Sequence, residues 1–526
     1  MGKDAHHLSQ FLDRSAASRP DHPAVEDERG KTYSYRELLH SADRLATRLH
    51  RWGVGRGDRV GLFLPKGREA VATIHGVLRS GAAYVPVDPG SPPIRGAGIL
   101  ADAGVKAVVV LAEHAQALRD AWPEAGPLPR FVVVGDEQGR TCPTDASWDR
   151  VMADDAPSPL PPAYDEDDVA YILYTSGSTG TPKGVMLSHA NAFAFLDWCD
   201  QSFDLEPTDR FASHAPFHFD LSIFDLYASC RAGGTLVLIG ESTGKDPARL
   251  GVFLSERGIS VWYSAPSILA LLAEYGGVDR LGRFAPRLVL FAGEVFPIAP
   301  LRKLRRAWPD STMWNLYGPT ETNVCTAFEI PRTIDADRET PFPIGPACPP
   351  ALARVVDDHG RDVPPGTVGE LVVSGPGVML GYFGRPDLTA RAFFLDDQGA
   401  WYRTGDLVTD EGDGCHRFHG RRDRMVKKRG YRIELGEIES ALYKHEGVDR
   451  AAVISRATDD GASLVAFVAM KPGLKGSIIA LKRHCTRFLP PYMVPDEVQF
   501  LSGLPTTSTD KVDYQGLKQM ATIAAD

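Results

Sequence analysis

A twelve-residue stretch of glycines, hydroxyl side chains and one lysine is the part of the sequence best suited to chemistry. It runs Tyr-Thr-Ser-Gly-Ser-Thr-Gly-Thr-Pro-Lys-Gly-Val over residues 174–185, after an apolar run at 169–173 that predicts a buried strand. Glycines let a backbone approach a ligand closely, so that successive N–H groups and hydroxyls can surround a polyphosphate, with Lys183 adding a positive charge. The stretch is not a P-loop, because Pro182 precedes the lysine and Gly184 follows it. We predict a phosphate-binding loop of another kind, formed by Thr175, Ser176, Gly177, Ser178, Thr179, Gly180 and Lys183.

Polar residues also follow two later apolar runs. Residues 287–294 and 313–322 both read as strands that end in loops, and Asp220 lies where a helix is expected to begin. Ligands of α/β sheets usually bind at such strand ends. The candidate residues in these two stretches are Gly293, Glu294, Asn315, Leu316, Tyr317, Gly318, Thr320 and Glu321.

The elements that must position these residues alternate between strand and helix. A capping box at 34–37 opens an amphipathic helix that ends near residue 53, and a strand at 60–64 and a helix at 68–78 follow. This alternation continues to about residue 322 and predicts a mostly parallel α/β core. Past residue 365 the sequence suggests a smaller β-rich subdomain.

A densely basic stretch at 420–432 is the clearest change in composition, and its plain interpretation is a solvated linker. Beyond it we expect a compact α+β unit, with helices near 434–445 and 476–487 and strands near 450–456, 463–469 and 497–501. We place the domain boundary between Arg422 and Asp423, which gives a core domain at 1–422 and a second domain at 423–526.

Composition excludes several classes of protein. A chain of 526 residues with 43% hydrophobic content is long enough for more than one globular domain. Its net charge of −10 argues against nucleic acid as the main partner. The seven cysteines form no C-x-x-C pair, which favours reduced thiols in a cytoplasmic protein over a zinc site or a disulfide framework. No apolar run is long enough to span a membrane, and the first residues do not resemble a signal peptide.

The motifs, taken in order, resemble those of the adenylate-forming superfamily, and most closely the free-standing adenylation enzymes of nonribosomal peptide synthesis. Besides residues 174–185, the resemblance rests on the motifs at 80–89, 217–225, 313–322, 402–407 and 420–432, so it covers nearly the whole chain. It implies a large N-terminal domain of two α/β subdomains and a small β-barrel-like subdomain, with a small mobile C-terminal domain. It also implies two half-reactions: a carboxylate and ATP form an acyl-adenylate and pyrophosphate, and a thiol then forms a thioester and releases AMP.

The resemblance assigns roles that fit the chemistry of each side chain. Glu321 would ligate Mg²⁺, which prefers carboxylate and phosphate oxygen. Asn315 would meet the adenine edge, Tyr317 would stack on the base, and Asp406 would accept both ribose hydroxyls. The catalytic residues are expected to be Lys511, Thr175 and Glu321, and the remaining ATP contacts Phe418 and Arg421.

The same resemblance describes how the small domain moves. Asp423 matches the hinge, and Gly430 belongs to a loop that reaches the site in the thioester-forming state. Lys511 would stabilise the charge that moves as the carboxylate attacks the α-phosphate. Here the family usually has Asn-Gly-Lys, whereas this chain has Thr509-Asp510-Lys511. An aspartate at that point could alter how the loop docks.

An apolar pocket with a single carboxylate is expected to choose the substrate. Asp220 is typical of α-amino-acid pockets in this family, because a carboxylate can pair with the substrate ammonium in a low-dielectric cleft. The apolar wall excludes charged side chains, which would be buried unpaired. The order of the pocket residues resembles that of proline-activating members, which predicts L-proline as substrate: Asp220, Leu221, Phe224, Tyr263, Leu290, Ala292, Leu316, Val324 and Cys325, closed by Lys511.

The thiol acceptor is expected in trans, as the 4′-phosphopantetheine arm of a separate peptidyl carrier protein, in a pathway that leads to a pyrrole or another natural product. Three alternatives remain open at this point. They are activation of another small apolar amino acid, an acyl-CoA or D-alanyl-carrier ligase, and a silent adenylate-binding scaffold. Asp220 argues against a CoA ligase, and the presence of Lys183, Glu321, Asp406 and Lys511 argues against a silent protein.

Overall fold

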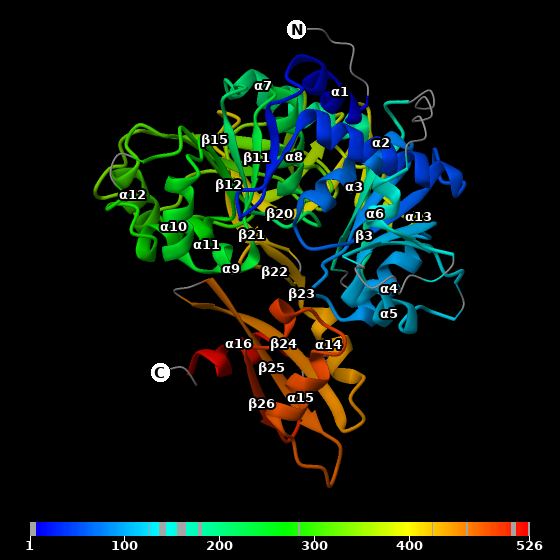
Figure 1. The fold of residues 1–526 in the computed structure, drawn as a ribbon. Helices are drawn as coiled ribbons and strands as arrows, with labels where there is room; N and C mark the ends of the chain where they lie inside the picture. The colour runs from blue at the N-terminus through cyan, green and yellow to red at the C-terminus, as the bar shows by residue number, and fades with distance from the viewer. Residues whose placement is uncertain are drawn as a thin grey trace.

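The chain forms a large N-terminal domain and a small C-terminal domain that lies below it in Figure 1. The structure is a computed structural model that describes residues 7–124, 126–135, 142, 144–154, 165–176, 181–281, 284–422, 424–458, 461–505 and 512–523. Among these residues, no helix combines the length and the apolar composition that crossing a bilayer requires.

The first eight-stranded sheet is parallel except at its two ends, where β14–β15 and β1–β2 pair antiparallel. Its strands, in spatial order, are β15 (Thr326–Ile330), β14 (Thr312–Tyr317), β13 (Leu288–Ala292), β12 (Val261–Ser264), β10 (Arg210–Ser213), β11 (Thr235–Leu238), β1 (Pro23–Glu26) and β2 (Thr32–Ser34). The helices between these strands along the chain are α8 (Leu221–Ala232), α9 (Glu241–Lys245), α10 (Pro247–Glu256), α11 (Pro266–Tyr275) and α12 (Ile298–Ala307).

The second eight-stranded sheet has the same character, with antiparallel strands at one end. Its order is β18 (Gly381–Tyr382), β9 (Lys183–Ser188), β8 (Val169–Thr175), β4 (Ala83–Pro86), β3 (Arg59–Phe63), β5 (Ala107–Leu111), β6 (Arg130–Val134) and β7 (Ala146–Ser147). The other helices that precede β10 along the chain are α1 (Ser9–Ser18), α2 (Tyr35–Arg51), α3 (Arg68–Arg79), α4 (Pro93–Asp102), α5 (Ala112–Asp120), α6 (Trp148–Met152) and α7 (His189–Ser202).

One apolar core joins the two sheets. It contains side chains of both sheets together with those of α3, α7 and α8, and in it Tyr227 of α8 donates a hydrogen bond to Tyr84 of β4 over 3.2 Å. The predicted capping box is present at the start of α2, where Ser34 accepts from the amide of Glu37 and the Glu37 carboxylate accepts from the amide of Ser34. The expectation of a mostly parallel α/β core is confirmed.

A five-stranded antiparallel sheet lies where a barrel-like subdomain was expected. Its strands are β16 (Leu352–Val356), β17 (Gly369–Ser374), β20 (Gly399–Asp410), β19 (Phe393–Asp396) and β21 (His416–Arg421), and helix α13 (Pro386–Ala392) precedes β19.

The small domain has its own apolar cores, built from residues past 425. A hairpin of β22 (Met425–Lys428) and β23 (Tyr431–Glu434) rises from it toward the large domain (Figure 1). Below the hairpin lie α14 (Leu435–Tyr443), β24 (Val448–Thr458), β25 (Gly461–Met470), α15 (Ile478–Cys485), a 3₁₀ turn at Pro491–Met493, β26 (Glu497–Leu501) and α16 (Tyr514–Ile523). The proposed hinge, Asp423, lies outside the described residues, so the domain boundary stays a prediction.

Candidate active site

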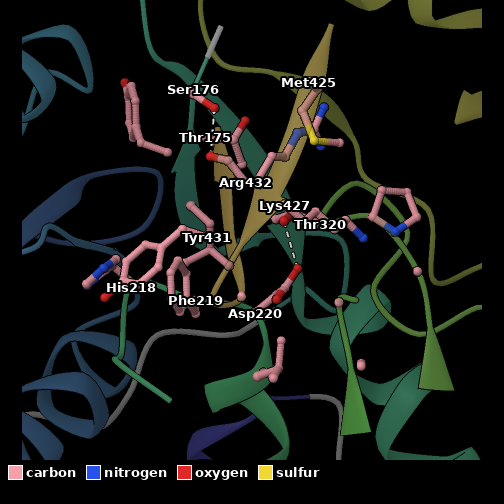
Figure 2. A pocket seen from close by; sticks show the side chains of 18 of the residues that line it. Thr175, Ser176, His218, Phe219, Asp220, Thr320, Met425, Lys427, Tyr431 and Arg432 are labelled. Atoms are coloured by element: carbon pink, nitrogen blue, oxygen red, sulfur yellow. Dashed lines mark hydrogen bonds between the residues drawn. The ribbon is translucent and has the colours of Figure 1, made fainter. Parts of the chain in front are cut away.

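The candidate site is a cleft between the large domain and the hairpin of the small domain. The end of β8 supplies Thr175 and Ser176, and the start of α8 supplies Asp220. The loop after β14 supplies Thr320, while Lys427 and Arg432 enter from the hairpin (Figure 2). Parallel strands deliver their carboxyl ends to one edge of a sheet, which explains why distant loops meet here.

Glu321 is the most deeply buried charged group of the site, with no exposed surface. Its Oε1 accepts from Lys183 Nζ at 3.2 Å and from the Tyr382 hydroxyl at 2.8 Å, and its Oε2 accepts from Arg432 Nη1 at 2.8 Å. Burial alone would raise the pKa of Glu321, but Arg432 and Lys183 outweigh burial and hold that pKa well below its usual range. Glu321 is therefore an anionic centre that the protein itself neutralises.

Lys183 is held in place from two sides. Its Nζ also donates to the Tyr382 hydroxyl at 2.8 Å and lies 4.1 Å from the centre of that ring. Burial lowers the pKa of Lys183, while the neighbouring Glu321 opposes the change. The end of β8 next to it is ready for a polar ligand, since the buried hydroxyl of Thr175 has no hydrogen-bond partner among the described residues.

Asp220 faces the cleft at the N-cap position, directly before the first residue of α8. Its Oδ2 accepts a hydrogen bond from the Thr320 hydroxyl at 2.7 Å, and no ion pair reaches it in the part of the chain that the structure describes. Burial raises the pKa of Asp220, whereas the hydrogen bond from Thr320 and the charge of Lys427 lower it to a smaller extent. A cationic ligand at this point would satisfy a carboxylate that the protein leaves without a close counter-charge.

The predicted pocket residues divide into a wall and a layer behind it. Asp220, Leu221, Tyr263, Ala292 and Val324 line the cavity, but the other four predicted residues do not: Phe224, Leu290, Leu316 and Cys325. Phe224 lies behind Tyr263, with ring centres 5.7 Å apart and planes at 85°, and Leu290 pairs with Tyr263 across β12 and β13. Leu316 lines a neighbouring cavity instead. Phe224 and Leu290 therefore support the wall from behind Tyr263.

That neighbouring cavity brings together the residues predicted to bind the nucleotide. It is lined by Gly293, Glu294, Asn315, Leu316, Tyr317, Phe418 and Arg421. The buried Asp406 accepts hydrogen bonds from the Tyr317 hydroxyl and from Arg421, the latter at 2.6 Å. Asn315 donates its amide to the carbonyl of Pro343 at 2.8 Å.

Close packing explains the glycine at 318. A Cβ added there would come within 1.5 Å of the carbonyl oxygen of Asn323, so no other residue fits without moving the loop. This contact fixes the turn that carries Thr320 and Glu321. Several predicted residues cannot be placed in this way, because Gly177, Ser178, Thr179, Gly180, Asp423 and Lys511 lie outside the described residues.

The basic stretch at 420–432 is a hairpin inserted into the site, and its interpretation as a solvated linker is wrong. The amide of Gly430 donates to Glu294 Oε1 at 2.7 Å, and Tyr431 packs on Phe219 and Tyr492 with ring centres 4.8 and 3.7 Å away. Burial lowers the pKa of Lys427, which faces the cleft from β22. The expectation that a loop containing Gly430 reaches the site agrees with this arrangement.

Sequence reasoning missed several residues that line the cleft. They are His218, Phe219, Met425, Lys427, Tyr431, Arg432, Tyr492 and Met493. A signal for the hairpin was present, because a glycine between two short runs of β-forming residues is typical of a tight turn. Gly430 adopts a φ of +80°, as such a turn requires.

Among the described residues, no group of three or more histidine, cysteine or acidic side chains could hold a metal ion by itself. Magnesium is commonly bound by one or two carboxylates together with substrate phosphates. The donor chemistry of Glu321, next to Lys183, fits that mode of binding.

Comparison with known proteins places this site in a family. The model of the AMP-binding enzyme family matches residues 12–383, and that of the AMP-binding enzyme C-terminal domain matches residues 437–511. An L-proline--[L-prolyl-carrier protein] ligase of Pseudomonas fluorescens is 42% identical, over 96% of this chain and 97% of its own length. A protein of the same name from Streptomyces coelicolor is 40% identical, over 92% and 91%.

A solved structure adds the fold. Holo-PA1221, described as an NRPS protein containing adenylation and PCP domains bound to a vinylsulfonamide inhibitor, has a TM-score of 0.78 and 25% identity. The match covers 97% of this chain and 84% of that one. The chain belongs to the AMP-binding enzyme family.

Proposed function

We propose that this chain activates L-proline with ATP and transfers the prolyl group to the phosphopantetheine thiol of a carrier protein. The observation that carries the proposal is Asp220, which makes no ion pair among the described residues and shares its cavity with the apolar side chains of Leu221, Ala292 and Val324 and the ring of Tyr263. A secondary ammonium would complete its charge, and a compact ring without polar groups suits the wall. The two ligases from Pseudomonas and Streptomyces support the same substrate.

In the first half-reaction, a carboxylate oxygen of proline would attack the α-phosphorus of ATP and pyrophosphate would leave. Lys183 would hold the phosphates, and Asp406, with Tyr317 and Arg421 beside it, would hold the ribose and base. When bound, Mg²⁺ would neutralise phosphate charge at Glu321. Lys511 is proposed to bridge the two reacting groups.

In the second half-reaction, the carrier thiol would attack the prolyl carbonyl carbon and AMP would leave with the electrons of the broken bond. Gly430 would leave room for the pantetheine arm, since a Cβ there would lie 3.1 Å from the Cβ of Ala265. We propose that the domain boundary at Asp423 lets the small domain exchange Lys511 for this hairpin.

Proline-dependent ATP–pyrophosphate exchange tests the first step, measured against a panel of amino acids. Proline should lead the panel, and the substrate assignment fails if another amino acid does. Loading of holo carrier proteins, followed by intact mass, tests the second step. Lys511→Ala should lose exchange and still bind ATP, so exchange that survived this change would remove Lys511 from its proposed role.

A further inference from the structure

Glu321 is covered by the hairpin in this structure. Arg432 lines the cavity and its side chain is 15% exposed, whereas Glu321 behind it does not line the cavity and has no exposed surface. The two groups form an ion pair of 2.8 Å at Oε2, and Lys183 and Tyr382 occupy Oε1. Both oxygens of the proposed metal ligand therefore already have partners.

The hairpin carries Arg432 to this position through its main chain. The hydroxyl of Ser176 donates to the Arg432 carbonyl at 2.9 Å (Figure 2). The same hydroxyl accepts from the amide of Glu434 at 3.1 Å. At the other end of the hairpin, the Gly430 amide is bonded to Glu294. Arg432 and Glu321 lie 111 positions apart in the sequence. Arg432 therefore depends on these docking contacts of the hairpin to reach Glu321.

We infer that Arg432 is a positioning residue that takes the place of the divalent cation on Glu321, so that hairpin docking and metal binding exclude each other. This inference rests on the proposed function. With Lys183 and Arg432 in place, Glu321 already faces two positive charges at hydrogen-bond distance. A divalent cation would add two more charges in a cleft of low dielectric, where like-charge repulsion is strong.

Replacement of the metal by Arg432 at Glu321 would link the two half-reactions. While the β- and γ-phosphates, or the pyrophosphate formed from them, occupy the phosphate end together with the metal, Glu321 would serve as a metal ligand and the hairpin would stay out; the adenylate itself stays bound when they leave. After they leave, Arg432 keeps Glu321 from remaining buried without a counter-charge, which would be costly. The hairpin then opens the way for the thiol once the adenylate has formed.

Hydrogen–deuterium exchange of peptides covering 425–434 tests the docking step in the full-length protein. In the wild type, Mg²⁺ with the non-hydrolysable analogue α,β-methylene ATP should speed exchange in the hairpin. Arg432→Gln should exchange fast without ligand, and Arg432→Lys should recover part of the protection. Arg456→Gln is the matched control, because it breaks an ion pair with Glu497 inside the small domain and away from the cleft.

The metal requirement is the second readout. Coupling between two binding events is reciprocal, so a variant without the competing arginine should bind the metal more readily. We expect the Mg²⁺ concentration needed for half-maximal binding of the ATP analogue to fall by about tenfold, which is within the usual range of coupling between two sites. Wild-type protection and a wild-type metal requirement in Arg432→Gln would overturn the inference. Neither readout uses proline or a carrier protein, so the outcome is independent of the substrate assignment.

Discussion

Two carboxylates of one cleft have opposite electrostatic surroundings. Glu321 accepts from Lys183, Arg432 and Tyr382 and has a pKa well below its usual range. Asp220 accepts from the neutral hydroxyl of Thr320, and burial raises its pKa. The same side-chain chemistry thus gives a fully paired carboxylate at the proposed phosphate end and, at the proposed amino-acid end, a carboxyl group with no ion pair among the described residues.

The difference shows where the positive charge that balances each carboxyl group comes from. At the phosphate end the protein supplies the counter-charge, which suits a region where the bound groups change between two half-reactions. At the amino-acid end the counter-charge is left for the ligand to bring. A pocket that is incomplete without a cation discriminates against neutral carboxylic acids, because they would leave Asp220 buried and unpaired.

The largest effect is expected from removing the charge at the phosphate end. Glu321→Gln should abolish detectable pyrophosphate exchange and lower the free energy of unfolding by about 3–5 kcal/mol, since Lys183 and Arg432 would remain buried without their partner. Exchange assays and urea unfolding at pH 7 measure the two effects.

Glu26→Gln is the matched control for this change. Glu26 is also a buried carboxylate between two cations, Arg210 and Arg257, each at 2.8 Å, but it lies on β1, outside the cleft. It should lose stability and keep exchange. Equal loss of exchange in both variants would mean that unfolding, and not the site, explains the result.

Removing the charge of Asp220 should strongly reduce the activation of proline and leave the affinity for ATP unchanged. Asp220→Asn keeps the shape and removes the charge, so kcat/KM for proline should fall about 100-fold, the cost of a lost buried ion pair of about 3 kcal/mol. ATP affinity, measured by calorimetry, should not change. Asp225→Asn, a buried change on the same helix outside the cavity wall, is the control, and a proline defect of equal size there would contradict the role of Asp220.

Thr320 allows a finer test, through pH. Its hydrogen bond lowers the pKa of Asp220, so Thr320→Val should raise that pKa further. Proline binding needs the ionised carboxylate, so activity falls as pH drops toward this pKa, and a higher pKa moves that acid limb to higher pH. The profile of kcat/KM for proline measures the shift.

Thr322→Val serves as the control for Thr320→Val. The Thr322 hydroxyl donates to the carbonyls of Pro319 and Asn323, two residues away from Thr320, and does not reach Asp220. An acid limb that stays in place in Thr320→Val, or moves equally in both variants, would show that Thr320 does not set the charge state of Asp220.

Much of this site could be predicted from the sequence because strand ends in an α/β sheet converge. The loops after β13 and β14 and the start of α8 lie where the pattern of apolar runs placed them. Within the predicted pocket set, Phe224 and Leu290 lie behind Tyr263 and Leu316 faces the next cavity. Which side chain reaches the surface of a cavity depends on packing that sequence spacing does not describe.

The contributions of the small domain were hardest to predict. The pairing of Arg432 with Glu321 requires a hairpin to dock across a domain interface, and a run of basic residues carries no local sign of such a partner. Helix α16 was also missed. It has a glycine at position 516 in its first turn, which weakens helix propensity, and its start is stabilised by Asp513 accepting from the amides of Gln515 and Gly516.

The smallest expected effect concerns the size of the substrate ring. Asp220 is proposed to select substrates that carry an ammonium group, and the apolar wall then distinguishes among them by ring size. One methylene in an apolar pocket is worth roughly 1–3 kcal/mol, so pipecolate and azetidine carboxylate should be activated about 10- to 200-fold less well than proline. Val324 lines the cavity and is 9% exposed. Val324→Ala should therefore favour the larger ring.

The measurement is the ratio of kcat/KM for pipecolate to that for proline, which cancels any loss of folded enzyme. We expect Val324→Ala to raise this ratio by about tenfold, the value of one accommodated methylene. Val237→Ala, a buried change on β11 outside the cavity, should leave the ratio unchanged because it removes the same methyl groups from the core alone. A ratio that does not move in Val324→Ala would mean that charge pairing at Asp220, without the shape of this wall, decides which ring is activated.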